Sequence, residues 1–349
     1  MTSSDISPST PAEVLVVGAG ISGLACARAL RQEGVAVRVI DRGRRPGGRM
    51  SGRTLHDRVV DLGASYFTVP DGSGFAAVVA DWEHRGLVHP WTDTFAVLGT
   101  AATGETAEGG TSTETGDTPT STAGTARRTT GPLRYAAARG LRSLAVDLAA
   151  ELHVERETEF GGIAADGTAD GIRYGTVVLA MPEPQAARLL PPSSALAAQL
   201  DTHSWGPVIA VALGFAECGW PAELHGAFVH GSPILTFLAD DGDRRGDGAP
   251  VIVAHSTAGF ARAHLEQPDG AVRAVEAEVR ALLGIDPGIR TDWSHAHRWT
   301  FARATTTHPE PFALQDGVGI CGDAWGGRSS VATAWASGDA LGRAIARRR

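Results

Sequence analysis

Residues 13–41 read EVLVVGAGISGLACARALRQEGVAVRVID, and this stretch decides the fold class. The apolar run at its start predicts a buried strand, and the Ala-rich stretch 24–32 has the apolar spacing of a helix. A glycine-rich turn lies between them, and a second apolar run, 35–40, ends at Asp41. The order of strand, turn, helix and strand predicts a βαβ unit of an α/β protein.

The turn has the pattern GxGxxG, which becomes specific when a strand precedes it, a helix follows it and an acid stands about 20 residues further on. Gly18 permits the tight turn, Gly20 lets a pyrophosphate approach the backbone, and Gly23 lets helix and strand pack closely. The helix N-terminus offers N–H groups to phosphate, and Asp41 is placed to accept hydrogen bonds from ribose hydroxyls. A plain βαβ turn is the alternative, but the full context favours a dinucleotide. The predicted contacts are Gly18, Gly20, Ile21, Ser22, Gly23 and Asp41.

A second loop, residues 42–50, reads RGRRPGGRM and favours FAD over NAD(P). It lies where the pyrophosphate and ribityl chain of a flavin would continue from the first turn. Its paired glycines let the backbone approach a ligand, and Arg49 supplies a rigid, positively charged fork. An Arg-rich solvated loop is the alternative. The predicted contacts are Arg42, Gly48, Arg49 and Met50, with FAD held non-covalently.

Composition narrows the class of protein. The chain has 349 residues, 43% of them hydrophobic, and a formal net charge of −8. This length suggests about two domains, and the negative balance argues against nucleic acid as the main partner. All 31 basic residues are Arg, because the sequence contains no Lys.

Cysteine usage and apolar runs indicate the compartment. Cys26, Cys218 and Cys321 are odd in number and widely spaced, which argues against a disulfide framework and favours a reducing compartment. No stretch reaches the ~18 to 20 apolar residues of a membrane span. Residues 1–12 lack the features of a signal peptide and are expected to be a disordered leader. We therefore expect a cytoplasmic protein without membrane contact.

The rest of the chain predicts further elements of both kinds. Apolar runs predict strands at 174–180, 207–215, 250–255 and 318–321. Helical spacing predicts helices at 140–150, 269–283 and 330–347. The run 99–126 has no apolar side chain larger than Ala apart from one Pro, so we expect a flexible insertion. A tolerated loop expansion is favoured over an active-site lid.

Segments at both ends of the chain, GAGISGLACARAL with DRGRRPGGRM and GICGDAW (319–325) with VATAWASG (331–338), resemble the FAD motifs of the flavin-containing amine oxidase superfamily. Within that superfamily, the chain is similar to renalases. The segments that carry this similarity are DLGASYFT (61–68), VLAMPEPQ (178–185), PVIVAHSTAGF (250–260) and HRW (297–299). The sequence departs from the family in the run 99–126. It also lacks the Lys that many amine oxidases place near the flavin.

The resemblance implies an α/β fold in which an FAD-binding, Rossmann-type domain (glutathione-reductase-like) receives an inserted β-rich substrate domain. We expect the FAD-binding domain in 13–68, 132–192 and 309–349, and the substrate domain in 69–131 and 193–308. Gly322, Asp323 and Val331 are expected to contact FAD where the last helix begins, although an acid there also fits an ordinary helix cap. Gly63, Ala64 and Phe160 complete the expected cofactor contacts.

The resemblance to renalases also implies an activity. These enzymes take hydride from the 2- or 6-dihydro isomers of NAD(P)H and pass it to O₂, giving NAD(P)⁺ and hydrogen peroxide. Loss of hydride from a dihydropyridine leaves an aromatic cation, so no dedicated acid–base pair is required. The expected partners are therefore a small dihydropyridine nucleotide and O₂. An amine or secondary-metabolite oxidase or desaturase on the same fold is the alternative, and a non-enzymatic FAD-holding redox sensor is a third reading.

Three residues are expected to be catalytic: Tyr66, His255 and Trp299. Tyr66 and Phe67 are expected to border the isoalloxazine, and Trp299 suits stacking on a planar ring. His255 ends a predicted strand and matches a family histidine near the flavin face. For each residue, a packed core position is the alternative.

Other polar residues carry no expected role in the chemistry. His295 and His297 share one strand face, but two histidines without a third ligand predict no metal site. Asp240 and Asp241 stand where relatives carry an amide, which makes a role at the site doubtful.

Overall fold

The structure is a computed structural model that describes residues 14–99 and 127–348. The expected leader and residues 100–126 of the expected insertion lie outside the described residues. The described chain divides into two units, the first made of 14–48, 145–205 and 304–348. The second contains 49–99, 127–144 and 206–303.

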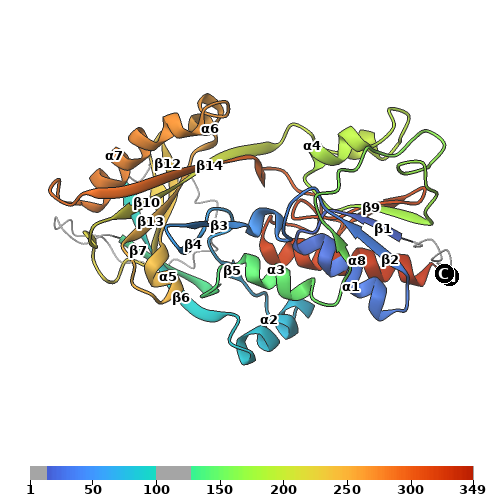
Figure 1. Cartoon of the computed structure of the whole chain (residues 1–349), viewed down its shortest axis with the longest axis horizontal. Helices are drawn as coiled ribbons and strands as arrows, with labels where there is room; N and C mark the ends of the chain where they lie inside the picture. Colours follow the sequence, from blue (N-terminus) through green and yellow to red (C-terminus); the bar gives the residue numbers. More distant parts are fainter. Residues whose placement is uncertain (1–13, 100–126, 349) are drawn as a thin grey trace, which may run out of the picture. The chain divides into compact units, whose positions relative to one another are not determined.

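The βαβ unit predicted at the start of the chain is present in the first unit. β1 (Val14–Val17) lies parallel to β2 (Val37–Ile40), and α1 (Ile21–Gln32) connects them. The strands form part of a six-stranded sheet in the order β15-β16-β9-β1-β2-β8 (Figure 1). Its other strands are β8 (Val154–Glu155), β9 (Thr176–Leu179), β15 (Ala313–Gln315) and β16 (Val318–Ile320). The pairs joining β16, β9, β1, β2 and β8 are parallel, and β15 is antiparallel.

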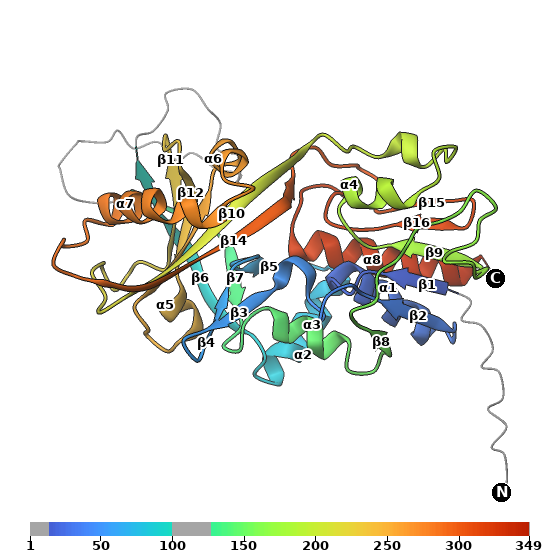
Figure 2. The ribbon, with the colours of Figure 1, turned by 45° about the horizontal axis from the view of Figure 1, so that its top comes forward.

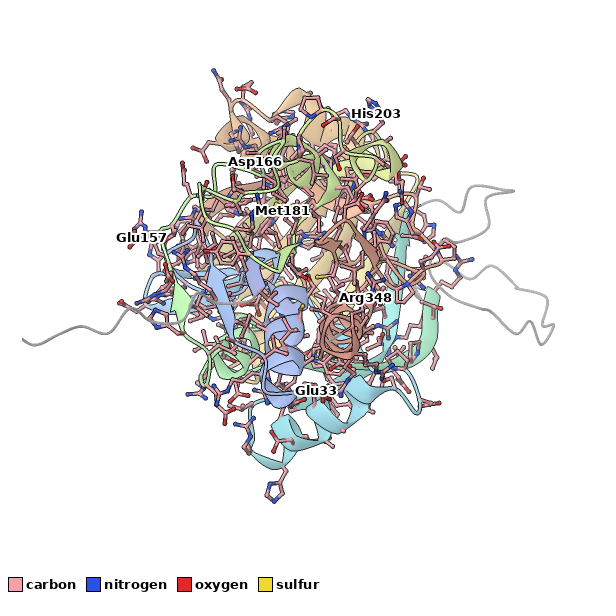
Figure 3. All side chains as sticks on the ribbon, turned by 90° about the vertical axis from the view of Figure 1, so that its right-hand side faces the viewer. Glu33, Glu157, Asp166, Met181, His203 and Arg348 are labelled. Atoms are coloured by element: carbon pink, nitrogen blue, oxygen red, sulfur yellow. The ribbon has the colours of Figure 1, made fainter. Side chains whose placement is uncertain are left out.

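The helix α8 (Val331–Arg347) packs directly against α1, as Figure 3 shows. Two glycines of α8 make this contact possible. A Cβ atom at Gly338 would lie 1.9 Å from the carbonyl oxygen of Ser22, and one at Gly342 would lie 2.5 Å from that of Cys26. Both distances are shorter than van der Waals contact, so the close approach of the two helix backbones requires glycine.

The first unit also contains short helices between its strands. These are α4 (Glu183–Ala186), η2 (Ala187–Leu189) and η3 (Ala197–Gln199). The helix α3 (Arg142–Leu148) runs across the point in the chain where the second unit ends and the first resumes.

The second unit is built on an eight-stranded sheet in the order β14-β10-β13-β12-β11-β6-β7-β5. Its strands are β5 (Phe67–Thr68), β6 (His89–Gly99), β7 (Arg127–Ala136), β10 (Trp205–Phe215), β11 (Gly226–His230), β12 (Leu235–Asp240), β13 (Val251–Ser256) and β14 (Thr291–Ala304). A separate hairpin pairs β3 (Gly52–Leu55) with β4 (Arg58–Asp61). The remaining helices are α2 (Gly74–His84), α5 (Asp241–Arg245), α6 (Ala258–Ala263), η4 (Pro268–Ala271) and α7 (Val272–Leu283).

The two faces of this sheet differ, because side chains alternate along each strand. One face carries an apolar cluster that includes Val211 and Leu213 of β10 together with Val275 and Val279 of α7. Figure 2 shows α6 and α7 beside the strands of this sheet. The alternating residues Ala210 and Ala212 instead join a cluster with β4. A third cluster contains Phe95 of β6 and Phe237 of β12, with Tyr66 packed against them. This aromatic cluster holds the candidate site.

The observed units differ from the expected domain boundaries in 49–68 and 132–144, which group with the second unit, and in 193–205 and 304–308, which group with the first. Strand pairing gives the reason for 49–68 and 132–144, since Phe67 of β5 lies opposite Tyr135 of β7 in the eight-stranded sheet. Strand and helix boundaries otherwise lie within a few residues of those predicted. Within the described residues, the protein has no helix with both the length and the apolarity needed to cross a membrane.

Candidate active site

The glycine-rich turn after β1 has the geometry of a dinucleotide cradle. Gly18 has φ +109°, and a Cβ atom there would lie 2.6 Å from the carbonyl oxygen of Ala180. A Cβ atom at Gly23 would lie 1.9 Å from the carbonyl oxygen of Gly18. A Cβ atom at Gly48 would lie 3.3 Å from the Cα of Gly20, so the two predicted glycine-rich loops meet. They form one surface of bare backbone, which suits a pyrophosphate.

The Asp41 carboxylate links the two glycine-rich loops by hydrogen bonds. Its Oδ2 accepts a hydrogen bond from the Ala19 amide at 2.6 Å, and its Oδ1 accepts one from the Gly43 amide at 2.6 Å. The Thr158 amide donates to the Asp41 carbonyl, which ties down the loop that leads into Phe160. A carboxylate has about four acceptor positions, so Asp41 retains capacity for ribose hydroxyls. Arg42 is exposed beside it.

The start of α8 forms the other expected part of the cofactor site. Ser330 caps the helix by accepting from the Thr333 amide at 3.0 Å, and Val331 is the first helical residue. Gly322 is held by its amide, which donates to the Ser337 hydroxyl at 3.0 Å. Asp323 is buried and accepts a hydrogen bond from the Ser329 hydroxyl. The positive end of the α8 dipole thus lies next to the segment that resembles the last FAD motif.

The cysteines of this unit are unsuited to bonding a flavin. Cys26 and Cys321 are both buried, and burial raises the pKa of each thiol. The pKa of Cys321 reaches about 12 even though a hydrogen bond with Ser22 opposes the shift. Because the thiolate is the nucleophile, a thiol that stays protonated at neutral pH is inert.

In the second unit, the segment 61–66 brings several predicted residues together. The Ala64 amide donates to the Arg49 carbonyl at 2.9 Å, and the Arg49 guanidinium donates to the Ala302 carbonyl at 3.1 Å. A Cβ atom at Gly63 would lie 1.9 Å from the Arg49 carbonyl oxygen and 3.2 Å from the ring of Trp299. Gly63 is therefore required for this contact. Met50 is buried beside Arg49 in the chain.

The three residues expected to be catalytic belong to one cluster. Trp299 donates from Nε1 to the Leu62 carbonyl at 2.7 Å, and a hydrogen bond also links the His255 ring to Leu62. The Phe237 ring lies 6.0 Å from the rings of both His255 and Tyr66. Phe67, next to Tyr66 in the chain, is stacked on Tyr135 in a separate aromatic group.

His255 is a neutral imidazole at physiological pH. Burial is the main cause that lowers its pKa to about 4, and the positive charge of Arg244 lowers it further, while the hydrogen bond to Leu62 opposes both. In the part of the chain that the structure describes, its buried Nε2 has no hydrogen-bond partner. A neutral ring with an unused nitrogen suits the orientation of a substrate polar group.

We expect His255 to make the protein sensitive to acid between about pH 6.5 and pH 4. In that range the unfolded imidazole, with its ordinary pKa of 6.5, binds a proton that the folded one does not. The free energy of unfolding therefore falls as the pH is lowered through this range. Urea unfolding at several pH values measures the slope. His255→Gln should flatten it, whereas His203→Gln at an exposed position should not; equal slopes in both variants would contradict the assignment.

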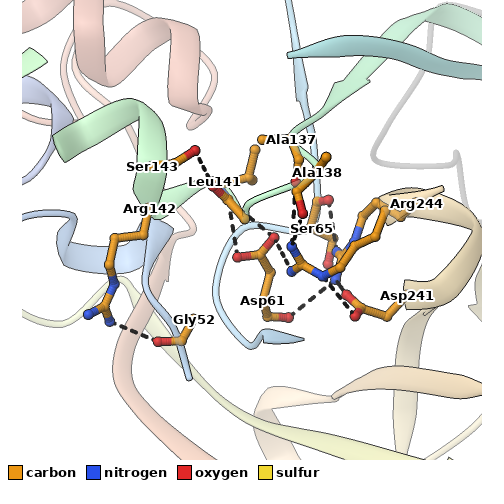
Figure 4. A network of polar contacts seen from close by, with 12 residues as sticks. Gly52, Asp61, Ser65, Ala137, Ala138, Leu141, Arg142, Ser143, Asp241 and Arg244 are labelled. Carbon is orange, nitrogen blue, oxygen red and sulfur yellow. Dashed lines mark hydrogen bonds and ion pairs between the residues drawn. The ribbon is translucent and has the colours of Figure 1, made fainter. Parts of the chain in front are cut away.

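A buried ionic network holds the segment 61–66 in place (Figure 4). Asp241 at the start of α5 is fully buried and is paired with Arg58, Arg244 and Arg245. Arg245 also bonds the Asp61 carboxylate at 2.9 Å. Burial alone would raise the pKa of Asp241, but the three guanidinium groups outweigh it and lower the pKa to about 2.

The network reaches the aromatic cluster through the backbone. Arg244 donates to the Ser65 carbonyl at 2.8 Å, and Asp61 accepts from the Leu141 amide at 3.2 Å. Both bonds constrain the segment that carries Leu62 and Tyr66. Sequence reasoning missed this role of Asp241. The spacing of Asp241, Arg244 and Arg245, three and four residues apart on one helix face, is the signal that would have found it.

Comparison with known proteins gives the family. The profile of the flavin containing amine oxidoreductases matches residues 122–345, more than half of the chain. The chain belongs to this family. A second profile, for an NAD(P)-binding Rossmann-like domain, matches residues 16–82. As a flavin containing amine oxidoreductase, the protein is an oxidoreductase with non-covalently bound FAD, and the glycine cradle and inert thiols described above fit that cofactor.

Solved structures of amine oxidases share the fold of this flavin containing amine oxidoreductase. Putrescine oxidase, in a structure with bound putrescine, has a TM-score of 0.69 and 16% identity, over 96% of this chain and 98% of that one. Cyclohexylamine oxidase from Brevibacterium oxydans has a TM-score of 0.68 and 16% identity, over 97% of this chain and 99% of that one. These likenesses confirm the predicted α/β fold with a Rossmann-like, FAD-binding domain and a β-rich domain.

A short stretch of sequence is similar to a further enzyme. The neurosporene-forming phytoene desaturase of Rhodobacter capsulatus is 49% identical over 57 residues. The match spans 16% of this chain and only 11% of the desaturase. The similarity is therefore limited to a short segment of both chains.

His295 and His297 lie on β14 in this amine oxidoreductase. His297 meets the ring of Trp299 edge-on, with centroids 4.6 Å apart. Burial is the main cause that lowers the pKa of His297 to about 4, and nearby Arg53 adds to it. Over residues 14–99 and 127–348, no three His, Cys, Asp or Glu side chains are grouped to hold a metal ion.

Proposed function

We propose that this chain is an oxidase or desaturase for a small amine or related secondary metabolite, with the Tyr66–Phe237–His255 cluster as its substrate site. The observation that carries the proposal is His255, a neutral imidazole whose buried Nε2 has no partner among the described residues. FAD supplies the hydride acceptor. His255 accepts a hydrogen bond from the substrate and orients it, and the aromatic rings exclude water around the carbon that loses hydride.

The renalase-like activity is a second candidate. Oxidation of a 2- or 6-dihydro isomer of NAD(P)H gives an aromatic cation and requires no base, which agrees with a chain that contains no Lys. In this candidate, Trp299 and Tyr66 flank a flat nicotinamide ring. Where either candidate acts as an oxidase, O₂ is the final acceptor and hydrogen peroxide is the product.

Anaerobic flavin reduction distinguishes the two candidates. Putrescine, cyclohexylamine, the 2- and 6-dihydro isomers of NAD(P)H and ordinary 4-dihydro NADH are mixed in turn with the FAD-loaded protein. We expect an amine to bleach the flavin absorbance fastest, and His255→Gln to slow this reaction without abolishing it, because His255 orients the substrate. Fast bleaching by the dihydro isomers alone would replace the proposal by the second candidate. No bleaching by any donor would contradict both.

We also propose the roles of the two units and of the predicted contacts. The first unit binds the adenine dinucleotide through Gly18, Gly20, Asp41 and the start of α8. Arg49, Gly63 and Ala64 are proposed as further contacts of FAD. The second unit selects the substrate.

Three free cysteines agree with a cytoplasmic location.

A further inference from the structure

A buried arginine on β7 has no counter-charge among the described residues. Arg134 is 5% exposed, and its Cζ lies 4.0 Å from the centre of the Phe95 ring and 5.5 Å from that of the Tyr66 ring. Its Nε and Nη1 atoms are shielded from water and find no hydrogen-bond partner in 14–99 or 127–348. The Nε–H and Nη1–H groups lie on opposite edges of the guanidinium plane, so each offers a separate donor to an oxygen atom of an anion.

Polar groups of the neighbouring strand β6 already have partners. Thr92, which lies opposite Arg134 on β6, bonds its hydroxyl to the Thr94 carbonyl at 3.0 Å. The Asp243 carboxylate accepts from Trp91 Nε1 at 2.6 Å and lies 2.7 Å from His225 Nδ1. A cation over aromatic rings gains about 2 kcal/mol, whereas burying an unpaired charge costs several kcal/mol. The fold therefore retains a cation that its described residues leave unneutralised.

The geometry points to Arg134 as an anion-binding residue of the substrate site, which takes a carboxylate or phosphate group of the substrate. The inference rests on the proposed function only in using the same cluster. Phe95, under the guanidinium, has its ring centre 5.5 Å from that of Phe237, and Phe237 contacts His255. A substrate held at one end by Arg134 thus places its flat part along the rings that lead to His255. A second ammonium group, as in a diamine, is repelled.

Paired probes test this inference on the FAD-loaded protein. Benzoate and benzamide differ in the carboxylate, and phenyl phosphate and phenol differ in the phosphate, so the two pairs separate the two sources of negative charge. Binding is measured by calorimetry and by the shift in flavin absorbance. We expect one of the anions to bind about tenfold or more tightly than its neutral counterpart, as charge-assisted hydrogen bonds predict.

Variants locate the preference. Arg134→Gln should abolish it, Arg134→Lys should keep part of it because the charge remains while the planar guanidinium donors are lost, and Arg290→Gln at an exposed ion pair should leave it unchanged. Equal binding of both members in both pairs would overturn the inference, even if the Arg134 variants fail to fold. So would a preference that survives Arg134→Gln. Flavin reduction is scored separately, so a protein that prefers anions but is reduced by no donor contradicts the proposed function alone.

Discussion

Asp241→Asn is expected to destabilise the second unit by about 3 to 5 kcal/mol, the cost of breaking a buried ion pair. The amide keeps the shape of the side chain but removes the charge that faces Arg58, Arg244 and Arg245. Arg245 would keep the Asp61 carboxylate and Arg58 the Asp247 carboxylate, but the buried Arg244 would lose its carboxylate partner. Thermal unfolding followed by circular dichroism should show a midpoint lowered by roughly 10 °C.

The matched control is Asp247→Asn, because Asp247 bonds the same arginine. Arg58 donates to its Oδ1 at 2.9 Å, but the Asp247 side chain is 46% exposed. We expect a loss of less than about 1 kcal/mol there. Similar losses in the two variants would show that burial of Asp241 does not decide the effect.

Acid should reproduce part of the Asp241→Asn effect in the parent protein. The folded pKa of Asp241, about 2, lies below the ordinary value of 3.8, so its contribution is present above pH 3.8 and is lost as the pH falls toward 2. Burial raises the pKa of Asp61, which gives that group the opposite dependence. In the Asp241→Asn variant, the part of the acid-induced loss of stability that comes from Asp241 should be absent.

Gly23→Ala is expected to reduce FAD affinity by more than about tenfold, because overpacking a close contact costs about 1 to 3 kcal/mol and moves the backbone. The added Cβ atom would lie 1.9 Å from the Gly18 carbonyl oxygen and 3.0 Å from the Ala180 side chain. Neither neighbour is the end of a flexible chain, so α1 must move away from the turn. Flavin absorbance per polypeptide after gel filtration measures the loss.

Gly259→Ala provides the control for the Gly23 variant. Gly259 lies in α6, and a Cβ atom there meets nothing within 4 Å. Alanine is favoured over glycine in helices, so this variant should be as yellow as the parent and slightly more stable. A Gly23→Ala protein that retains full flavin would contradict the assigned role of the turn.

The cofactor half of the protein could be predicted because its signals are local. Strand, turn and helix lie within 13–41, and each glycine has one steric reason visible from spacing alone. The packing of α8 on α1 was not predicted, since Gly338 and Ser22 lie far apart in the chain.

The substrate half depends on contacts that no local pattern contains. Arg245 and Asp61 are 184 residues apart, yet they form one buried pair. Nothing in the local sequence distinguishes Arg134 from other arginines, because its aromatic neighbours Phe95 and Tyr66 come from other parts of the chain. Tyr66, His255 and Trp299 were chosen by resemblance, and their common links to Leu62 and Phe237 come from the structure alone.

The division of the first unit into three segments sets an order for biosynthesis. The sheet around β1 gains β9 from the second segment and β16 from the third, and α8 covers α1. The third segment leaves the ribosome only after residues 206–303 have been made. While the eight-stranded sheet is being synthesised, the surface of α1 that later packs against α8 therefore stays exposed in the nascent chain. We expect flavin loading to follow translation, and chaperones that shield apolar helix faces to set the yield of active protein.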